Sequence, residues 1–548
     1  MCYIIKRLIK TEIIMAIVRQ FDKRSGITYV FDCVCFRDKV TRKPRSTRTL
    51  IGRLDTVTGE VVPTDGRMKR AKEKKESSEF ESAKPVQCIR QYFGATYLLD
   101  KIGDKLGITD DLKKCLGDDY KKFLSIVYFT ILEDKSPLYR FGKWNVTHRH
   151  PYGKDIPSQR SSDLLMSISQ SQIDHFCQLQ SKHRQDNEYL LFDSTSISSY
   201  SAVLKQAQYG HNKENDPIPQ FNMSLLFGEQ SQLPFNYRKL SGNIPDVKIL
   251  KNLFTELDFL GHKKPKLVTD KGFFSKENIE DMFKERIKFL LSAKTSVKLI
   301  TEQIEKVYSV IQQVQYYNNS YQLYSMTIPA MCEIGRQKKY KNSVSNKKHR
   351  VYAHVYYDIM RMAEKQNKLD KHITELKDEL QSNKRKLSNE KQYEKYFTVK
   401  KRKTGNIVTI KEDVVKAEKQ YYGFFVLLGS EKMDSITALE LYRNKDIIEK
   451  AFGNLKDRLN LRRTLVSSES GLDGKLFVGF VGLIYLAYIK KQMQEKDLFK
   501  TYTITELLDK IDLIECFKYP GKKLQIGEIL EKQKQIFLDL DIKPPLYL

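Results

Sequence analysis

The sequence predicts an α/β protein in which helices flank a mixed sheet, and three observations predict this class. Three strand-like apolar runs follow one another within residues 188–243. Residues 245–293 then alternate helix, strand, helix and strand, with Ser275 placed to cap the second helix. A further apolar run at residues 421–429 resumes the strand pattern after a long interval. Strands and helices that alternate in this way favour one sheet covered by helices.

Two modules precede this sheet. Residues 16–65 contain short runs of β-branched and aromatic residues between glycine and basic turns, which predicts a small β-rich module. The charged stretch at residues 66–84 is typical of a linker or a solvated helix. From residue 88 to residue 185, apolar residues recur at three- and four-residue intervals, which predicts a helical domain.

A long insertion interrupts the sheet. After Ala293 the strand pattern lapses through a Tyr-rich run, a basic run at Arg336–Arg350 and a long helical segment at residues 360–387. The apolar heptad positions of that segment are sparse, so it is interpreted as a solvated or hairpin helix and not as an intermolecular coiled coil. The stretch therefore predicts an inserted subdomain.

These patterns divide the chain into six regions. The predicted regions are 1–80, an N-terminal β-rich module and linker; 81–186, a helical domain; 187–300, the first part of the mixed sheet; 301–420, the insertion subdomain; 421–490, the second part of the mixed sheet; and 491–548, a C-terminal helical region.

Composition points to a polyanionic partner. The chain has 96 Lys and Arg residues against 68 Asp and Glu residues, a formal net charge of +28, which favours nucleic acid or an anionic membrane surface. The longest apolar run, Leu476–Ile489, is short for a bilayer span and is interpreted as a buried helix, so no membrane partner is expected. The 8 cysteines are scattered without a Cys-x-x-Cys pair. Neither a disulfide framework nor a zinc site is predicted, and a reducing cytoplasm fits.

Two apolar strand-like runs end in a carboxylate, at Asp193 and at Asp270. Asp193 alone would more often cap a turn. The ends of neighbouring strands can bring two carboxylates side by side, however, and such a pair repels unless a cation lies between them. The two aspartates together therefore predict a metal site. Asp246, which also follows a strand-like run, is interpreted as an N-terminal helix residue and not as a ligand.

A third element at residues 441–461 reads as one amphipathic helix. On a helical wheel, Tyr442, Lys445, Glu449 and Lys456 fall within roughly 60° of one another. A glutamate flanked by two lysines and a phenol suits an anionic ligand held through a metal. An ordinary amphipathic helix with a Lys/Glu surface gives the same pattern, so this element alone decides nothing.

Together, the three pieces resemble the catalytic core of bacterial insertion-sequence transposases of the Asp-Asp-Glu (DDE) type. The resemblance is to the branch with the signature Tyr, two residues, Arg, three residues, Glu, six residues, Lys. Tyr442, Lys445, Glu449 and Lys456 have this spacing, with Lys445 where the family usually has arginine, so positive charge is kept but a bidentate phosphate clamp is lost. The resemblance covers residues 90–490 and includes the segments DSTSISSYS, SGNIPD, TDKGFFS and GKLFVGFVGLIYLAY.

The resemblance implies a fold, a reaction and a set of site residues. The fold would be ribonuclease-H-like, with an insertion between the second aspartate and the glutamate. Asp193, Asp270 and Glu449 would be the catalytic residues and would hold two Mg²⁺ ions, with Mn²⁺ as a substitute. The enzyme would cut the terminal inverted repeats of a mobile element and join them to target DNA.

The resemblance also implies roles for the regions and for partners. Residues 187–300 and 421–490 would form the two parts of the catalytic core, and residues 1–80 would contain the DNA-end-binding module. Tyr442, Lys445 and Lys456 would bind DNA phosphates, and the protein would act as a homodimer on double-stranded DNA. The expected location is the bacterial cytoplasm, in association with the nucleoid.

Two alternatives remain open. One is mobilising chemistry that uses a His-x-His metal site and a tyrosine nucleophile, because His148, His150 and Tyr152 lie together. Against it, the residue between the histidines is the charged Arg149 and the surroundings resemble a loop, so packing is the expected role of these histidines and of Trp144. The other alternative is a catalytically inactive transposase-derived protein that binds DNA ends or represses transcription.

Overall fold

The computed structural model divides into two compact units, residues 1–87 and 88–548, which are described separately. The linker at 66–84 and most of the basic run at 336–350 lie outside the described residues. The described residues are 14–37, 44–64, 88–183, 187–201, 203–210, 216–262, 264–334, 347–402, 405–464, 466 and 468–546.

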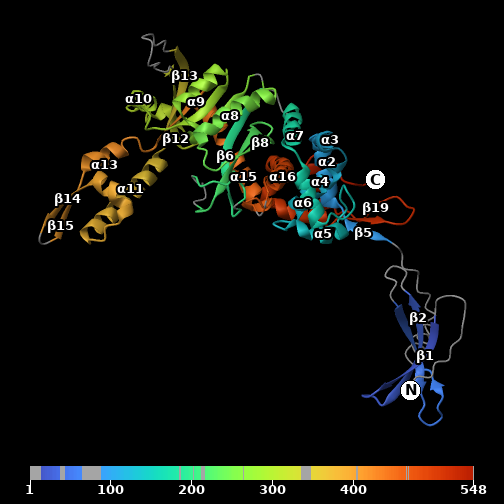
Figure 1. The fold of residues 1–548 in the computed structure, drawn as a ribbon. Coiled ribbons are helices and arrows are strands. Elements are labelled where there is room, and N and C mark those ends of the chain that lie inside the picture. Colours follow the sequence, from blue (N-terminus) through green and yellow to red (C-terminus); the bar gives the residue numbers. More distant parts are fainter. Residues whose placement is uncertain are drawn as a thin grey trace, which may run out of the picture. The chain divides into compact units, whose positions relative to one another are not determined.

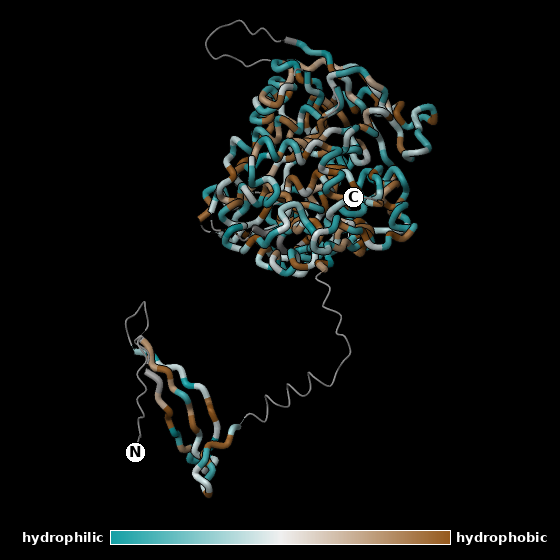
Figure 2. Tube along the Cα trace, turned by 90° about the vertical axis from the view of Figure 1, so that its right-hand side faces the viewer, coloured by the Kyte–Doolittle hydropathy of each residue, from teal (hydrophilic) through white to brown (hydrophobic). Residues whose placement is uncertain are grey.

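The first unit is an antiparallel sheet in the order β1-β2-β3-β4. It lies where the sequence predicts a β-rich module. Val30 and Cys33 are buried in it, but most of β3 is exposed. Figure 2 shows hydrophobic and hydrophilic segments along the same strands of this unit. The strands are β1 (Ile14–Asp22), β2 (Ile27–Arg37), β3 (Pro44–Leu54) and β4 (Val61–Val62).

The second unit begins with the predicted helices, which surround one apolar helix from the far end of the chain. That helix is α16 (Glu469–Glu495), which packs against α4 and α6 and contributes most of its length to the main core. Ser169 caps α7 through a capping box with Gln172. The helices are α2 (Gly94–Lys105), α3 (Ile108–Leu116), α4 (Tyr120–Leu132), α5 (Phe141–Thr147), α6 (Ser158–Ser167) and α7 (Gln170–Lys182), with short 3₁₀ turns at Gly117–Asp119 and Leu138–Arg140.

Among the described residues, α16 is the one helix long and apolar enough to cross a membrane. Its apolar window is 83% buried inside the protein, which is the environment of a core helix. The prediction of a buried helix at Leu476–Ile489 is therefore confirmed.

The central feature is a ten-stranded mixed sheet, of which Figure 1 labels the strands β6, β8, β12 and β13. The strand order is β11-β12-β13-β16-β10-β9-β6-β7-β8, with β17 beside β6. The pairs β6-β9, β9-β10 and β6-β17 are parallel and the others antiparallel. The elements of the first part follow in the predicted order: β6 (Tyr189–Ser199), β7 (Gln220–Gly228), β8 (Pro234–Ser241), α8 (Asp246–Phe259), β9 (Lys266–Thr269), α9 (Lys276–Lys284) and β10 (Lys288–Ala293).

The segment after Ala293 differs from the expectation of a separate subdomain, because its strands extend the same sheet. Strand β13 lies between β12 and β16, and β16 pairs with β10 on its other side. The Tyr-rich runs supply these strands, since aromatic and β-branched residues suit a pleated, half-buried surface. The elements are α10 (Lys298–Val307), the turn Val314–Tyr316, β11 (Tyr317–Asn318), β12 (Leu323–Ile334), β13 (Lys347–Tyr357) and β16 (Phe424–Gly429).

Between β13 and β16 the chain forms a small lobe at residues 359–419 with its own apolar core (Figure 1). Leu369, Ile373, Leu376 and Leu380 of the long helix are buried in that core, which fits the predicted hairpin helix. The chain leaves and rejoins the sheet at Tyr357 and Phe424, which pair across the two strands. The lobe comprises α11 (Ile359–Gln381), the turn Leu387–Asn389, α12 (Glu390–Tyr396), β14 (Phe397–Arg402), β15 (Gly405–Ile410) and α13 (Glu412–Lys419).

The last part of the chain returns to the first helices. Strand β18 pairs with β5 (Ile89–Tyr92), so this C-terminal region, expected to be helical, also completes a three-stranded sheet. The remaining elements are α14 (Ser435–Arg443), α15 (Asp446–Gly453), a π-helical turn (Asn454–Arg458), β17 (Arg463–Thr464), the turn Leu498–Lys500, α17 (Ile504–Asp512), β18 (Glu515–Lys518), β19 (Gln525–Ile526) and α18 (Glu531–Asp539).

Candidate active site

Strand register brings the two predicted aspartates together. Leu191 of β6 pairs with Val268 of β9 in a parallel ladder. Asp193 and Asp270 lie two residues further along the chain from this pair, Asp193 within β6 and Asp270 directly after β9, so continuing the register sets them side by side. Because side chains alternate along a strand, both point to the same face of the sheet.

Asp193 does not end its strand, contrary to the prediction. Strand β6 continues through Ser199, and Asp193 pairs with Leu225 within the sheet. The hydroxyl residues that follow Asp193 continue the strand. One of them, Ser196, donates a hydrogen bond to Asn222 Oδ1 of the neighbouring strand at 3.2 Å. Asp270, by contrast, directly follows β9, as predicted, and its carboxylate accepts the backbone N–H of Lys271 at 2.7 Å.

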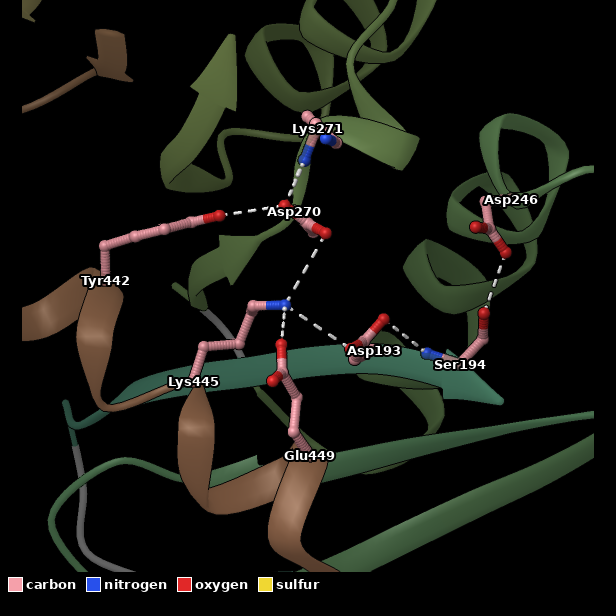
Figure 3. A network of polar contacts seen from close by, with 8 residues as sticks. All are labelled: Asp193, Ser194, Asp246, Asp270, Lys271, Tyr442, Lys445 and Glu449. Carbon is pink, nitrogen blue, oxygen red and sulfur yellow. Dashed lines mark hydrogen bonds and ion pairs between the residues drawn. The ribbon is translucent and has the colours of Figure 1, made fainter. Parts of the chain in front are cut away.

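The predicted glutamate lies on α15, which faces these aspartates (Figure 3). Lys445 is the N-cap residue of α15, and Glu449 follows one turn later on the same side. Tyr442 lies in the last turn of the preceding helix, α14. Asp193, Asp270 and Glu449, which we call the carboxylate cluster, thus come from three separate elements.

One ammonium group joins the carboxylate cluster. Lys445 Nζ lies 3.5 Å from Asp193 Oδ2, 3.6 Å from Asp270 Oδ2 and 3.0 Å from Glu449 Oε1 (Figure 3). Tyr442 adds a hydrogen bond, because its hydroxyl donates to Asp270 Oδ1 at 2.8 Å. The Lys445 side chain is 6% exposed, whereas that of Glu449 is 58% exposed. The cluster is therefore buried on the side of Lys445 and open to solvent on the side of Glu449.

The charges explain the protonation states of the site. Burial alone would raise the pKa of Asp270, but the charge of Lys445 and the hydrogen bonds from Tyr442 and the Lys271 N–H together hold that pKa below its usual value. Burial alone would lower the pKa of Lys445, but the charges of Asp193 and Asp270 and the contact with Glu449 raise it. Burial and the charge of Asp270 raise the pKa of Tyr442. The site therefore contains ionised Asp270, protonated Lys445 and a neutral phenol.

The donor set fits a hard divalent cation. Three carboxylates that converge on one positive group supply the oxygen ligands that Mg²⁺ prefers, and one lysine leaves their charge only partly neutralised. Within the described residues, no group of three or more His, Cys, Asp or Glu side chains is gathered closely enough to hold a metal ion. In the carboxylate cluster, Lys445 Nζ stands between the three carboxylates and contacts each of them.

The predicted single helix at residues 441–461 is wrong. The chain turns at Asn444 and Lys445 between α14 and α15, and α15 continues into a π-helical turn. A π turn is wider than an α turn, so positions beyond Gly453 no longer follow the wheel. Lys456 lies in that turn and is buried, and the network of Figure 3 does not include it.

Sequence reasoning missed how the inserted strands support this site. Tyr356 of β13 donates to Ser435 O at 2.5 Å, and Ser435 Oγ lies 2.9 Å from Ser325 Oγ of β12. Tyr321 donates to Glu440 Oε1 at 2.7 Å. These contacts fix α14, and with it Tyr442, to the extended part of the sheet. No sequence spacing signals them, because the partners are 79 to 119 positions apart.

The two histidines of the alternative metal site are packed and hydrogen-bonded. His148 stacks on Trp144 with ring centroids 4.8 Å apart, and its Nε2 contacts Asp512 at 2.9 Å. His150 uses both ring nitrogens, with Ser125 Oγ and Asn145 Oδ1 each at 2.9 Å. Both rings are buried, which is the packing role expected for them.

Comparisons with known proteins place the chain among transposases. The family described as "Transposase DDE domain" matches residues 184–482, which is more than half of the chain. A comparison with curated proteins finds no match. Among solved structures, a cryo-EM structure of piggyBac transposase in a synaptic complex with hairpin DNA is similar at 9% sequence identity and a TM-score of 0.35, over 77% of each chain.

Proposed function

Because the chain belongs to the family of transposases with a DDE domain, we propose that it cuts DNA at the ends of a bacterial insertion sequence and joins those ends to target DNA. The observation that carries this proposal is the convergence of Asp193, Asp270 and Glu449 on Lys445 Nζ. These three carboxylates are the catalytic residues of the proposed reaction. The proposed branch of the family is the one with the Tyr-Arg-Glu-Lys signature. Tyr442, Lys445, Glu449 and Lys456 have the spacing of that signature, with lysine in place of the arginine.

The sheet supports a ribonuclease-H-like core as part of this proposal. An antiparallel meander, β6-β7-β8, is followed by two helix-strand units whose strands, β9 and β10, lie parallel to β6 on its other side. The first aspartate is on the first strand, the second follows the fourth, and the glutamate is on a later helix. In a ribonuclease-H-like core of this kind, the long segment between Asp270 and Glu449 would be the insertion expected between the second aspartate and the glutamate.

Asp193, Asp270 and Glu449 would hold two Mg²⁺ ions, for which Mn²⁺ can substitute. Bound there, such ions activate the attacking oxygen and stabilise the leaving oxygen of a phosphodiester. The chain's contribution is a partly buried set of oxygen donors from three elements, which Lys445 Nζ joins in this structure. Tyr442 and the Lys271 N–H orient Asp270, and the Ser194 N–H orients Asp193 at 2.8 Å.

The proposed reaction proceeds in two displacements. Water first attacks the phosphodiester at the end of the element, which frees a 3′-hydroxyl, and this hydroxyl then attacks target DNA. No covalent protein intermediate is involved. The raised pKa of Tyr442 supports this route, because a phenol that stays protonated and donates a hydrogen bond to Asp270 is a poor nucleophile.

Charge supports double-stranded DNA as the partner. The net charge of +28 provides an electrostatic attraction for phosphates. In the proposal, the N-terminal sheet and the basic run at 336–350 bind the terminal inverted repeats. Tyr442, Lys445 and Lys456 contact phosphates near the cut, and two copies of the chain pair the two ends.

A cleavage assay tests the proposed function. The substrate is a duplex that ends in the terminal inverted repeat flanking the gene, incubated with Mg²⁺ or with Ca²⁺. We expect cutting at the repeat end with Mg²⁺ only. Glu449→Gln removes one charge without changing side-chain shape and should abolish cutting while DNA binding survives.

The matched control is Asp446→Asn, an exposed acid on the same helix, which should cut like the wild type. Tight, specific binding by a wild type that cuts in neither Mg²⁺ nor Mn²⁺ would refute the enzyme. It would favour the inactive end-binding protein instead.

A further inference from the structure

The two aspartates are also connected on the opposite face of the sheet, away from Lys445. Neighbouring residues of a strand point to opposite faces, so Ser194 faces away from the side on which Asp193 meets Lys445. There the Ser194 hydroxyl donates to Asp246 Oδ1 at 2.7 Å (Figure 3). Asp246 is the first residue of α8. The strand that carries the first aspartate is thus tied to the start of a helix.

The same helix start contacts the turn that carries the second aspartate. A Cβ atom built on Gly272 would lie 3.0 Å from Asp246 Oδ2, so the Asp246 carboxylate packs directly against the backbone two residues after Asp270. Glycine at position 272 permits this close approach. Asp246 therefore lies between the β6 strand and the Asp270 turn.

A buried amide closes the connection. Asn278, on α9, donates from Nδ2 to Val247 O at 3.0 Å and to Phe273 O at 2.8 Å. One side chain thereby joins the second residue of α8 to the turn that begins at Asp270. Asn278 is 4% exposed, so the loss of either bond would leave a buried polar group without its partner.

We infer that Asp246 is a positioning residue, which acts through Ser194 and the Asp270 turn to fix the two catalytic aspartates relative to each other. This inference rests on the proposed function and extends it to a residue outside the carboxylate cluster. Asp246 does not touch the reacting atoms. It sets the spacing of Asp193 and Asp270, on which their shared affinity for a divalent cation depends.

The effect should appear as weakened cation binding. When a residue that orients a metal ligand without touching the metal is removed, the metal affinity or the activity typically falls by about 10-fold to 100-fold. Asp246→Ala should therefore raise the Mn²⁺ dissociation constant of the protein alone, measured by calorimetry, by about 10-fold or more. It should also raise the Mg²⁺ concentration needed for half-maximal cutting, while DNA binding in Ca²⁺ stays unchanged.

Ser194→Ala should give a similar loss. The double variant should be no worse than Asp246→Ala alone, because both substitutions remove the same Ser194–Asp246 hydrogen bond. Asp246→Asn should behave nearly as the wild type, since its amide oxygen still accepts the Ser194 hydroxyl. Asp258→Ala, an exposed acid on the same helix, is the matched control, and circular dichroism melting checks that each variant is folded.

If the wild type cuts DNA and folded Asp246→Ala binds Mn²⁺ as tightly as the wild type, the inference is overturned and the proposed function stands. Equal damage from Asp246→Asn and Asp246→Ala also overturns it, because the charge and not the hydrogen bond would then matter. Failure of the wild type to cut repeat DNA refutes the proposed function itself. Mn²⁺ binding still reports on Asp246 in that case.

Discussion

Lys445 Nζ lies 3.0 Å from Glu449 Oε1, one helical turn further along the chain, so a buried ammonium is paired with a carboxylate that is open to solvent. The same ammonium contacts both aspartates of the sheet. Three negative groups thus share one positive group. A change at position 445 will therefore be felt by all three carboxylates.

Replacement of Lys445 by methionine should destabilise the protein in the absence of divalent ions, because the carboxylates then repel one another across a partly buried site. The expected loss is about 1–3 kcal/mol, less than for a fully buried pair, since Glu449 and Asp270 retain solvent. Ca²⁺ should restore part of the loss by neutralising the same charges. Urea denaturation in EDTA and in Ca²⁺ measures both effects.

Lys450→Met, at an exposed position of the same helix, is the control and should change little. Lys445→Arg should keep the stability, because it keeps the charge. A Lys445→Met variant as stable as the wild type in EDTA would contradict this account of the site.

Asp100 should make stability depend on pH. Burial raises its pKa to about 6 from a usual 3.8, although Tyr128 donates a hydrogen bond to it at 2.8 Å. The folded state therefore binds this proton more tightly than the unfolded state. The contribution of Asp100 to stability is retained below pH 3.8 and is lost as pH rises through about 6.

Asp100→Asn keeps an acceptor for Tyr128 and cannot ionise. It should be more stable than the wild type at pH 7.5, by about 1–3 kcal/mol, with a smaller difference at pH 5. Urea denaturation at the two pH values provides the comparison, with exposed Asp104→Asn as the control. A stability difference that is independent of pH would show that ionisation of Asp100 has no part in it.

Loss of the His150 ring should reduce stability and leave the chemistry intact. His150→Ala removes the donor to Asn145 Oδ1, while Ser125 Oγ keeps its hydrogen bonds with Lys121 O and the Tyr152 N–H, and the change should cost about 1–3 kcal/mol. The cutting rate per folded molecule should equal that of the wild type. Tyr152→Phe should also cut normally, and loss of cutting in either variant with retained fold would revive the His-x-His alternative.

Arginines of the N-terminal sheet should contribute to the salt dependence of DNA binding. Arg48 and Arg53 lie exposed on β3. Changing both to glutamine should reduce the log–log slope of affinity against salt by about 0.9 for each phosphate that the variant no longer neutralises. Filter binding from low to moderate salt measures the slope, and the exposed neutral change Gln20→Ala serves as the control. An unchanged slope would remove β3 from the DNA-binding surface.

Much of the fold could be predicted from local patterns. The strands and helices from β6 to β10 appear in the predicted order, and Ser275 caps α9 by accepting the Asn278 N–H at 3.0 Å. Hydrophobic periodicity and capping residues are local signals, so sequence alone carries them. Sheet order is not local, and for this reason the membership of β11, β12 and β13 in the central sheet was missed.

The candidate site shows the same division. Spacing and residue type identified Asp193, Asp270 and Glu449, whose metal and catalytic roles stay predictions. An ideal helical wheel could not foresee the turn at Lys445 or the π turn that carries Lys456, because both depend on packing against elements distant in the sequence; α15 packs on β6 and the π turn on α16. The phosphate-binding roles predicted for these lysines also remain predictions, and Lys445 contacts the carboxylates instead.

The lobe at residues 359–419 leaves and rejoins the sheet between residues that already pair, Tyr357 with Phe424, and Asp358 donates its N–H to Gly423 O at 3.0 Å. Its two connections therefore form the neck of a hairpin, and its apolar core is separate from that of the sheet. The lobe is thus an insertion between two adjacent, paired strands of the sheet. A tight turn joining β13 to β16 would therefore close the sheet in its place, and we expect the sheet that carries the carboxylate cluster to tolerate changes in the size of the lobe.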